Sequence, residues 1–217
     1  MSSGVAKGRR TGRAEPSRKH LMTAAIDCFA RLGYQGSSID RIARDAGITK
    51  GAVYYHFRDK EELLFAAVKD RIGSFSKEVL RDAAAQDPLT TLRRVVDVCF
   101  FHATVSNHRR FIITLMVEAL DTNPRLSLEF RTILRSMRGF LADVVRQGRE
   151  RGTFRSDVDP AAAAAALVAG IMGAEIQHYQ DPEEIDLRAV LDTLVEQFAV
   201  WLAPGGATRA AGGVEAW

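Results

Sequence analysis

The stretch SSIDRIARDAGITKGAVYYHF, residues 37–57, decides the fold because it predicts two short helices joined by a tight turn. Ile39 and Ile42 stand at the spacing of a buried helical stripe. Gly47 tolerates the positive φ that a tight turn needs, and Thr49 is a suitable N-cap for the next helix. This is the helix-turn-helix plan, whose second helix enters the major groove of DNA.

Capping residues place the neighbouring helices. Ser17 opens a helix that Gly33 closes, and Ser37 with Asp40 forms a capping box for the helix that follows. Asp59 caps a fourth helix, which carries the chain into its larger part.

The second helix of the pair presents chemistry suited to DNA at its N-terminus. Lys50 can donate to guanine O6 and N7, and the methyl group of Thr49 can pack on a thymine methyl. Gly51 costs about 1 kcal/mol inside a helix, but it lets the backbone approach the duplex closely.

The aromatic residues of this helix divide by helical angle. Val53 and Phe57 are four residues apart and are expected in the core. Tyr55, His56 and Lys60 can donate to phosphate oxygens, although ordinary amphipathic packing is the alternative for the tyrosines and the histidine.

Charge is distributed unevenly along the chain. Residues 1–60 carry 12 Lys and Arg against 5 Asp and Glu, a net charge of +7, whereas residues 61–217 carry a net charge of −4. A basic end on a mildly acidic body favours a polyanion partner for that end, with a solvated basic tail as the alternative.

These residues resemble the amino-terminal domain of the TetR family of transcriptional regulators over roughly residues 17–68. The positions at family spacing are Gly33-Tyr34, Ser37-Ser38, Ile42-Ala43, Ala46-Gly47, Gly51, Tyr54-Tyr55-His56-Phe57 and Lys60-Glu61. The resemblance implies base-facing roles for Thr49, Lys50, Gly51 and Tyr54. It implies phosphate contacts for Ser37, Ser38, Tyr55, His56 and Lys60, with Arg44 as a flanking contact.

The rest of the chain predicts helices throughout, so the fold class is all-α with about nine helices in total. We expect a disordered basic arm over 1–15, a three-helix DNA-binding domain over 16–60, a helical ligand-binding and dimerisation domain over 61–203, and a flexible tail over 204–217. The ligand and dimer functions of the body come from the resemblance.

The last two helices suggest dimerisation. Leu187, Leu191, Leu194, Phe198 and Trp201 step by four and three residues, as in a coiled-coil seam, and Gly170 and Gly173 on the preceding helix would allow close approach. A homodimer is predicted because helix-turn-helix proteins generally read two half-sites, and burial of these faces within one chain is the alternative.

Candidate pocket residues lie on the middle helices. Each apolar one could equally be plain core, and His102 could equally be a satisfied interface histidine. The candidates are Phe101, His102, Phe111, Met116, Glu118, Phe140, Met172 and Gln177.

Other function classes have little support in the sequence. Catalytic and nucleotide-binding motifs are missing, and the histidines do not stand at metal-ligand spacing, so neither an enzyme nor a cofactor or metal site is expected. Cys28 and Cys99 predict no disulfide framework, and no secretory signal or membrane span is expected, which favours a cytoplasmic protein.

The sequence therefore predicts a homodimeric, sequence-specific regulator that binds a palindromic double-stranded operator. Its expected mode is repression, with release by a small, mostly apolar effector. The alternative is a DNA-binding organiser or regulator without small-molecule input.

Overall fold

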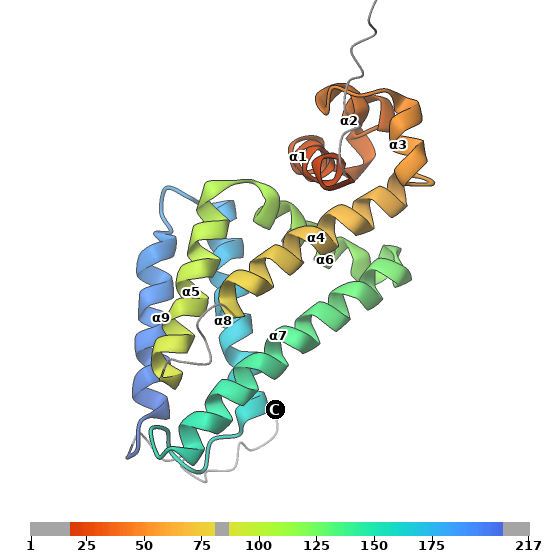
Figure 1. Ribbon diagram of the computed structural model, residues 1–217. Helices are drawn as coiled ribbons and strands as arrows, with labels where there is room; N and C mark the ends of the chain where they lie inside the picture. Colours follow the sequence, from red (N-terminus) through yellow and green to blue (C-terminus); the bar gives the residue numbers. More distant parts are fainter. Residues whose placement is uncertain (1–17, 81–86, 206–217) are drawn as a thin grey trace, which may run out of the picture. The chain divides into compact units, whose positions relative to one another are not determined.

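The computed structural model describes residues 18–80 and 87–205. The predicted Ser17 cap and basic arm, and nearly all of the predicted tail, lie outside them. The described residues form nine helices and no strand, which confirms the all-α prediction (Figure 1). The helices are α1 Arg18–Gly36, α2 Ile39–Asp45, α3 Lys50–His56, α4 Lys60–Leu80, α5 Pro88–Val105, α6 His108–Thr122, α7 Pro124–Glu150, α8 Pro160–Gln180 and α9 Leu187–Leu202.

The chain divides into two compact units, residues 1–67 and 68–217. The division lies at residue 67 rather than at the predicted 60, because the first two turns of α4 supply buried residues to unit 1. These residues are Leu63, Leu64 and Ala67.

Unit 1 is built on α1, α2, α3 and the beginning of α4. Gly33 interrupts the helical dihedrals near the end of α1 with φ +71°, a conformation that favours glycine. The N-cap of α2 is Ser38, whose hydroxyl accepts from Arg41 N, so the prediction of Ser37 as the cap was wrong by one residue. Asp40 does not complete a capping box, because its carboxylate pairs with Lys50 instead.

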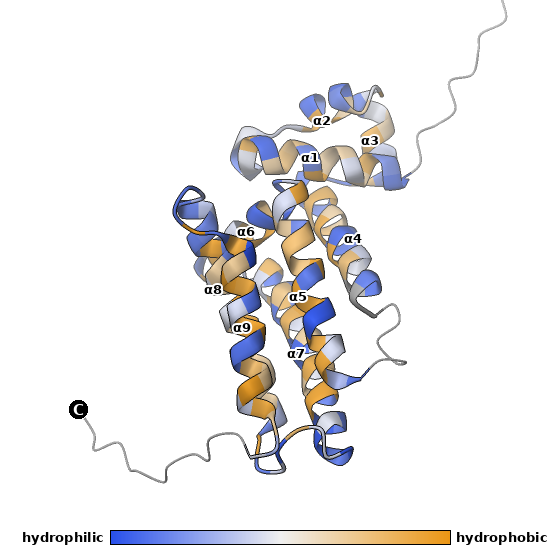
Figure 2. Cartoon of the chain, turned by 90° about the vertical axis from the view of Figure 1, so that its left-hand side faces the viewer, coloured by the Kyte–Doolittle hydropathy of each residue, from blue (hydrophilic) through white to orange (hydrophobic). Residues whose placement is uncertain are grey.

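Unit 2 packs α5, α7, α8 and α9 around a common apolar core. Orange and blue patches alternate along α5 and α9, as expected for helices with one buried face (Figure 2). Asp87, Asn123 and Asp159 cap α5, α7 and α8, each of which has proline in its first turn. The predicted Asp159-Pro160 start of α8 is therefore confirmed.

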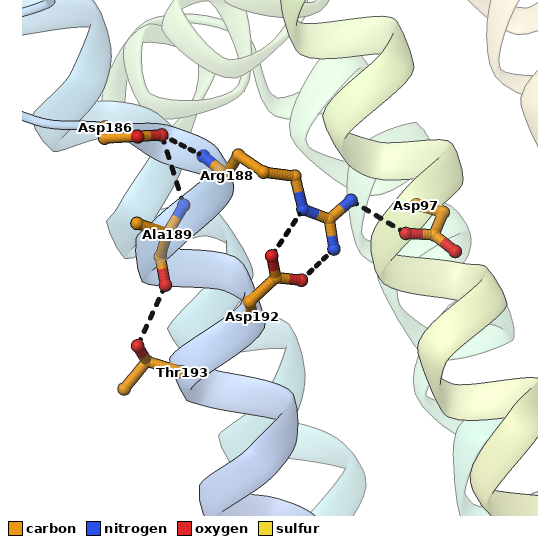
Figure 3. Close-up of polar contacts among 6 residues, drawn as sticks. All are labelled: Asp97, Asp186, Arg188, Ala189, Asp192 and Thr193. Carbon is orange, nitrogen blue, oxygen red and sulfur yellow. Dashed lines mark hydrogen bonds and ion pairs between the residues drawn. The ribbon is translucent and has the colours of Figure 1, made fainter.

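The last helix begins at Leu187, four residues after the predicted start at 183. Asp186 accepts hydrogen bonds from the amides of Arg188 and Ala189 and so defines the helix N-terminus (Figure 3). Arg188 then joins α9 to α5, since its guanidinium pairs with Asp192 on its own helix and with Asp97 at 2.8 Å on α5.

Candidate DNA-binding surface and ligand cavity

The turn between α2 and α3 is fixed by backbone geometry. Gly47 has φ +68°, and the amide of Ile48 donates to the carbonyl of Ala43 at 2.9 Å. Thr49 caps α3 by accepting from Ala52 N, as predicted. Val53 is 0% exposed and Phe57 is 1% exposed, so both are core residues, as predicted.

The opposite side of α3 is open to solvent. Tyr54 is 48% exposed and Tyr55 is 75% exposed, and Lys50 and Gly51 are also exposed. The ring of His56, half-buried, meets the ring of Tyr55 edge-on at 5.0 Å. The helix therefore has a buried face and a face of hydrogen-bond donors, which is the arrangement that a recognition helix requires.

Packing within the described residues does not require glycine at position 51. A Cβ built at this position would meet only the hydroxyl of Thr49, at 3.8 Å, which is ordinary van der Waals contact. Glycine is unfavourable in a helix, so close approach of DNA to the backbone at Gly51 stays a prediction that this open position allows.

Lys50 is paired with Asp40 across the two helices of the motif, at 2.9 Å between Nζ and Oδ2. Hydrogen bonding to that carboxylate raises the pKa of Lys50 above its ordinary value, so the side chain is charged. Both side chains are about half exposed, and such pairs open at little cost.

Ser37 and Lys60, two of the predicted phosphate contacts, donate to backbone carbonyls within unit 1. Ser37 is 4% exposed, and its hydroxyl donates to the carbonyl of Gly33 at 2.6 Å, so it has no proton left for a phosphate. Lys60 donates to the carbonyls of Tyr34 and Ser37 at 2.8 and 3.0 Å and lies 4.1 Å from the centre of the Tyr34 ring. Both side chains hold the end of α1 against the start of α2 and α4.

Ser38 and Arg44 are exposed and keep donors for an external partner. The hydroxyl of Ser38 accepts from the backbone, which leaves its own proton free to donate. Contact of either residue with DNA stays a prediction.

Lys60→Ala should lower the thermal unfolding midpoint, because it removes two charge-assisted hydrogen bonds of about 1.5–3 kcal/mol each. The predicted phosphate contact further requires the slope of log affinity against log salt concentration to become shallower by about 0.9 for each protomer bound. Lys77→Ala, at an exposed lysine on the same helix, is the matched control. An unchanged midpoint would contradict the structural role, and an unchanged slope would contradict the phosphate contact.

A cavity of about 350 Å³ lies within unit 2 and is lined mostly by apolar side chains. It has contributions from α4, α5, α6, α7 and α8. Four of the predicted ligand residues line it, namely His102, Met116, Phe140 and Met172.

The other four predicted ligand residues lie elsewhere. The side chain of Phe101 is 51% exposed, whereas the next residue, His102, is buried. Phe111 and Glu118 do not line the cavity either. Gln177 lines a separate groove between α8 and α9. These four residues do not line this cavity, so a ligand contact for any of them stays a prediction.

Sequence reasoning missed cavity residues on α4 and α7. Phe130, Ile133 and Met137 recur at helical spacing along α7 and could have been found by that period. Arg71 and Phe75 on α4 lie in the predicted ligand-binding domain, but the sequence does not show which face of α4 meets the other helices of unit 2.

A buried ion pair lies beside the cavity. Arg109, a lining residue, donates from Nε and Nη2 to the two carboxylate oxygens of Glu175 at 2.9 and 3.0 Å. Burial disfavours the Arg109 cation, but the Glu175 carboxylate more than offsets this, so the pKa of Arg109 lies above its ordinary value. The guanidinium also lies over the ring of Phe75, 5.2 Å from its centre.

The predicted dimer residues divide between core and surface. Leu187 and Leu191 are 2% and 0% exposed in the chain's own core, so the predicted heptad seam was wrong at these two positions. Leu194 and Phe198 pack partly against that core. Trp201 is 39% exposed, and Gly170 and Gly173 line the groove between α8 and α9.

Metal and membrane sites have little support. In the part of the chain that the structure describes, no three His, Cys, Asp or Glu side chains are grouped to hold a metal ion. Of the described helices, α8 alone is long and apolar enough to cross a membrane by composition, but Leu167, Ile171 and Ala174 pack in the core and its Glu175 pairs with Arg109. This helix is a core helix of unit 2.

Two family models match the chain in succession. The model of bacterial regulatory proteins of the tetR family matches residues 21–67, and that of the C-terminal part of BetI-type transcriptional repressors matches residues 88–200. Together they cover the helix-turn-helix and most of unit 2.

Individual proteins agree with this assignment. The HTH-type transcriptional repressor KstR2 of Mycobacterium tuberculosis is 30% identical over 157 residues, 70% of this chain and 76% of that protein. The fatty acid metabolism regulator protein of Bacillus subtilis is 23% identical over 181 residues, 83% and 93% of the two chains. The fold is shared with FadR from Bacillus subtilis, solved in complex with stearoyl-CoA, at a TM-score of 0.74 and 21% identity over 84% of this chain and 98% of that one. The chain therefore belongs to the TetR family of transcriptional regulators, whose members are DNA-binding proteins and not enzymes.

Proposed function

We propose that this protein is a homodimeric repressor that binds a palindromic operator and leaves it when a small, mostly apolar ligand enters unit 2. The observation that carries the proposal is the coexistence of two features in one chain. The exposed face of α3 supports DNA binding, and the apolar cavity of unit 2 supports ligand binding. A cytoplasmic location is part of the same proposal.

The base contacts are assigned to the N-terminal part of α3. Thr49, Lys50, Gly51 and Tyr54 lie on its exposed side and are the proposed base-facing residues. Tyr55, His56 and Ser38 are the proposed phosphate donors, and Arg44 is the proposed flanking contact.

Dimerisation is assigned to the outer face of α8 and α9. That face offers Gly173, Val190 and Thr193 along an open groove, and Val200 is 71% exposed beyond it. Uncharged side chains of this size allow two helix pairs to meet in a four-helix interface about a two-fold axis. The two α3 helices would then have to lie about 34–36 Å apart to fit successive major grooves.

Release of DNA requires a ligand that distinguishes two states. A ligand that binds both states equally shifts nothing, so the effector must favour a body conformation in which the α3 helices no longer fit the operator. Ligand-responsive repression is also supported by the relatives, one of which was solved with an acyl-coenzyme A thioester.

The experiment begins with selection of duplexes from a random library by the full-length chain. A palindromic consensus with two half-sites about one helical turn apart, bound by a dimer in native mass spectrometry, is the expected result. Gly173→Arg should abolish both the dimer and operator binding, whereas the exposed Glu184→Arg should leave both intact. Recovery of no consensus, or tight operator binding by a monomer, would overturn the proposal.

A further inference from the structure

The cavity of unit 2 is lined by more basic than acidic side chains. Its basic members are Lys69, Arg71 and Arg109, and its one carboxylate is Glu129. Arg109 is already neutralised by Glu175, and Lys69 is exposed to water. Of these three cations, the half-buried guanidinium of Arg71 is therefore the one that a bound anion would stabilise most.

A hydrogen-bonded chain fixes the position of Arg71. Its Nη2 lies 2.8 Å from Nδ1 of His102, and Nε2 of His102 lies 2.9 Å from Glu78 Oε2. A guanidinium can only donate, so Nδ1 must be the acceptor, and the imidazole proton is on Nε2 and is donated to Glu78. The carboxylate of Glu78 is therefore bound to the imidazole and not to the guanidinium, and Arg71 has a neutral acceptor as its direct partner.

The chain is held by its surroundings. The side chain of His102 is 8% exposed, and the rings of Phe75 and Phe101 meet it edge-on at 5.4 and 5.3 Å. Within residues 18–80 and 87–205 no carboxylate forms an ion pair with Arg71, and its remaining N–H groups have no assigned acceptor. A fixed cation at the wall of an apolar cavity is a site for an anion.

We propose that the cavity takes an amphiphile with an apolar body and a single anionic group, and that Arg71 binds the anionic group. His102 and Glu78 are positioning residues, which orient the guanidinium without touching the ligand charge. The apolar body would contact Ile112, Phe130 and Met137. This inference rests on the proposed ligand-responsive function and specifies the chemistry of the ligand.

The size of the cavity limits the ligand. About 350 Å³ holds roughly a dozen groups of the size of a water molecule. A monocarboxylate of about ten carbons matches that volume, and its carboxylate matches the two parallel donors of a guanidinium.

The test compares decanoate with 1-decanol on the full-length chain, by calorimetry at about pH 8 and below micellar concentrations. Both probes have ten carbons in one unbranched chain, and only decanoate is charged. We expect decanoate to bind at least about tenfold more tightly than decanol, because a hydrogen bond to a charged group is worth about that factor. Arg71→Gln should remove this preference and leave decanol affinity unchanged.

Two further variants control the result. Lys77→Gln removes a positive charge from an exposed position on the same helix and should keep the preference. His102→Gln should reduce the ratio of decanoate to decanol affinity, which a purely structural residue would not change. If Arg71→Gln fails to fold, Arg71→Lys keeps the positive charge but lacks the two parallel donors of the guanidinium. It should give an intermediate ratio of decanoate to decanol affinity.

Several outcomes would overturn the inference. Equal affinity of the wild type for the two probes, or a preference retained in Arg71→Gln, removes the anion site and leaves the proposed ligand-responsive function standing. If the wild type binds no carboxylate and no alcohol of six to twelve carbons, both the anion site and the proposed apolar effector are contradicted. Operator binding by the same preparation shows that the DNA-binding part of the proposed function is unaffected.

Discussion

Glu175→Leu is expected to lower the free energy of unfolding of unit 2 by about 3–5 kcal/mol, because it leaves the charge of Arg109 buried without a counter-ion. Glu175 is 0% exposed, and both its carboxylate oxygens accept from Arg109. Urea denaturation at fixed protein concentration, followed by tryptophan fluorescence, measures the change. Trp201 on α9 lies in unit 2 and supplies a fluorescence signal for that unit.

The double variant Arg109→Met with Glu175→Leu is the decisive comparison. It replaces the buried pair by apolar side chains of similar volume, and such replacements are often neutral or stabilising. We expect it to recover most of the stability lost in the single variant. Glu118→Leu, at an exposed glutamate on α6, should change stability by no more than about 0.5 kcal/mol. Equal losses for the single and double variants would show that packing volume, and not the unpaired charge, controls this site.

Gly51→Gln is expected to separate stability from DNA binding. The Cβ of the new side chain makes only an ordinary contact with the Thr49 hydroxyl, and glutamine has a higher helix propensity than glycine. The free energy of unfolding should therefore rise slightly, by up to about 1 kcal/mol. Affinity for the selected operator should fall at least about 100-fold, because the added bulk prevents close approach. Two lost base contacts of about 1–3 kcal/mol each account for that factor.

The matched control is Gly139→Gln on α7. Gly139 is also an exposed helical glycine with open space around its Cα, and it lies in unit 2. It should give the same small gain in stability with unchanged operator affinity, measured by fluorescence anisotropy at one salt concentration. Undiminished operator affinity of Gly51→Gln would show that the duplex does not approach this face of α3.

The sequence predicted the parts of the fold that local chemistry controls. Helix caps and tight turns depend on residues within a few positions of one another, so a sequence read without a structure can predict them. The caps at Thr49 and Asp159 and the turn at Gly47 are of this kind. Val53 and Phe57 were assigned correctly to the core for the same reason, since helical angle alone separates them from Tyr54 and Tyr55.

The parts that depend on contacts distant in sequence were predicted less well. Leu187 and Leu191 repeat as a coiled-coil seam does, but the same period serves burial within one chain, and only packing against α5 and α8 decides between the two. Lys60 stands at family spacing, yet its ammonium donates hydrogen bonds to backbone carbonyls about 25 residues earlier in the chain. The hydrogen-bonded chain of Glu78, His102 and Arg71 joins residues up to 31 positions apart, so no local pattern in the sequence predicts it.

The ion pair between Lys50 and Asp40 has a consequence for operator discrimination. The ammonium of Lys50 has three N–H donors, so in the proposed complex it can donate to Asp40 and to a base at the same time. The carboxylate would then hold the ammonium on one side of the motif and favour a base whose acceptors lie within reach of that position, such as guanine with O6 and N7. Asp40 would in this way contribute to sequence preference without touching DNA, by orienting the residue that does.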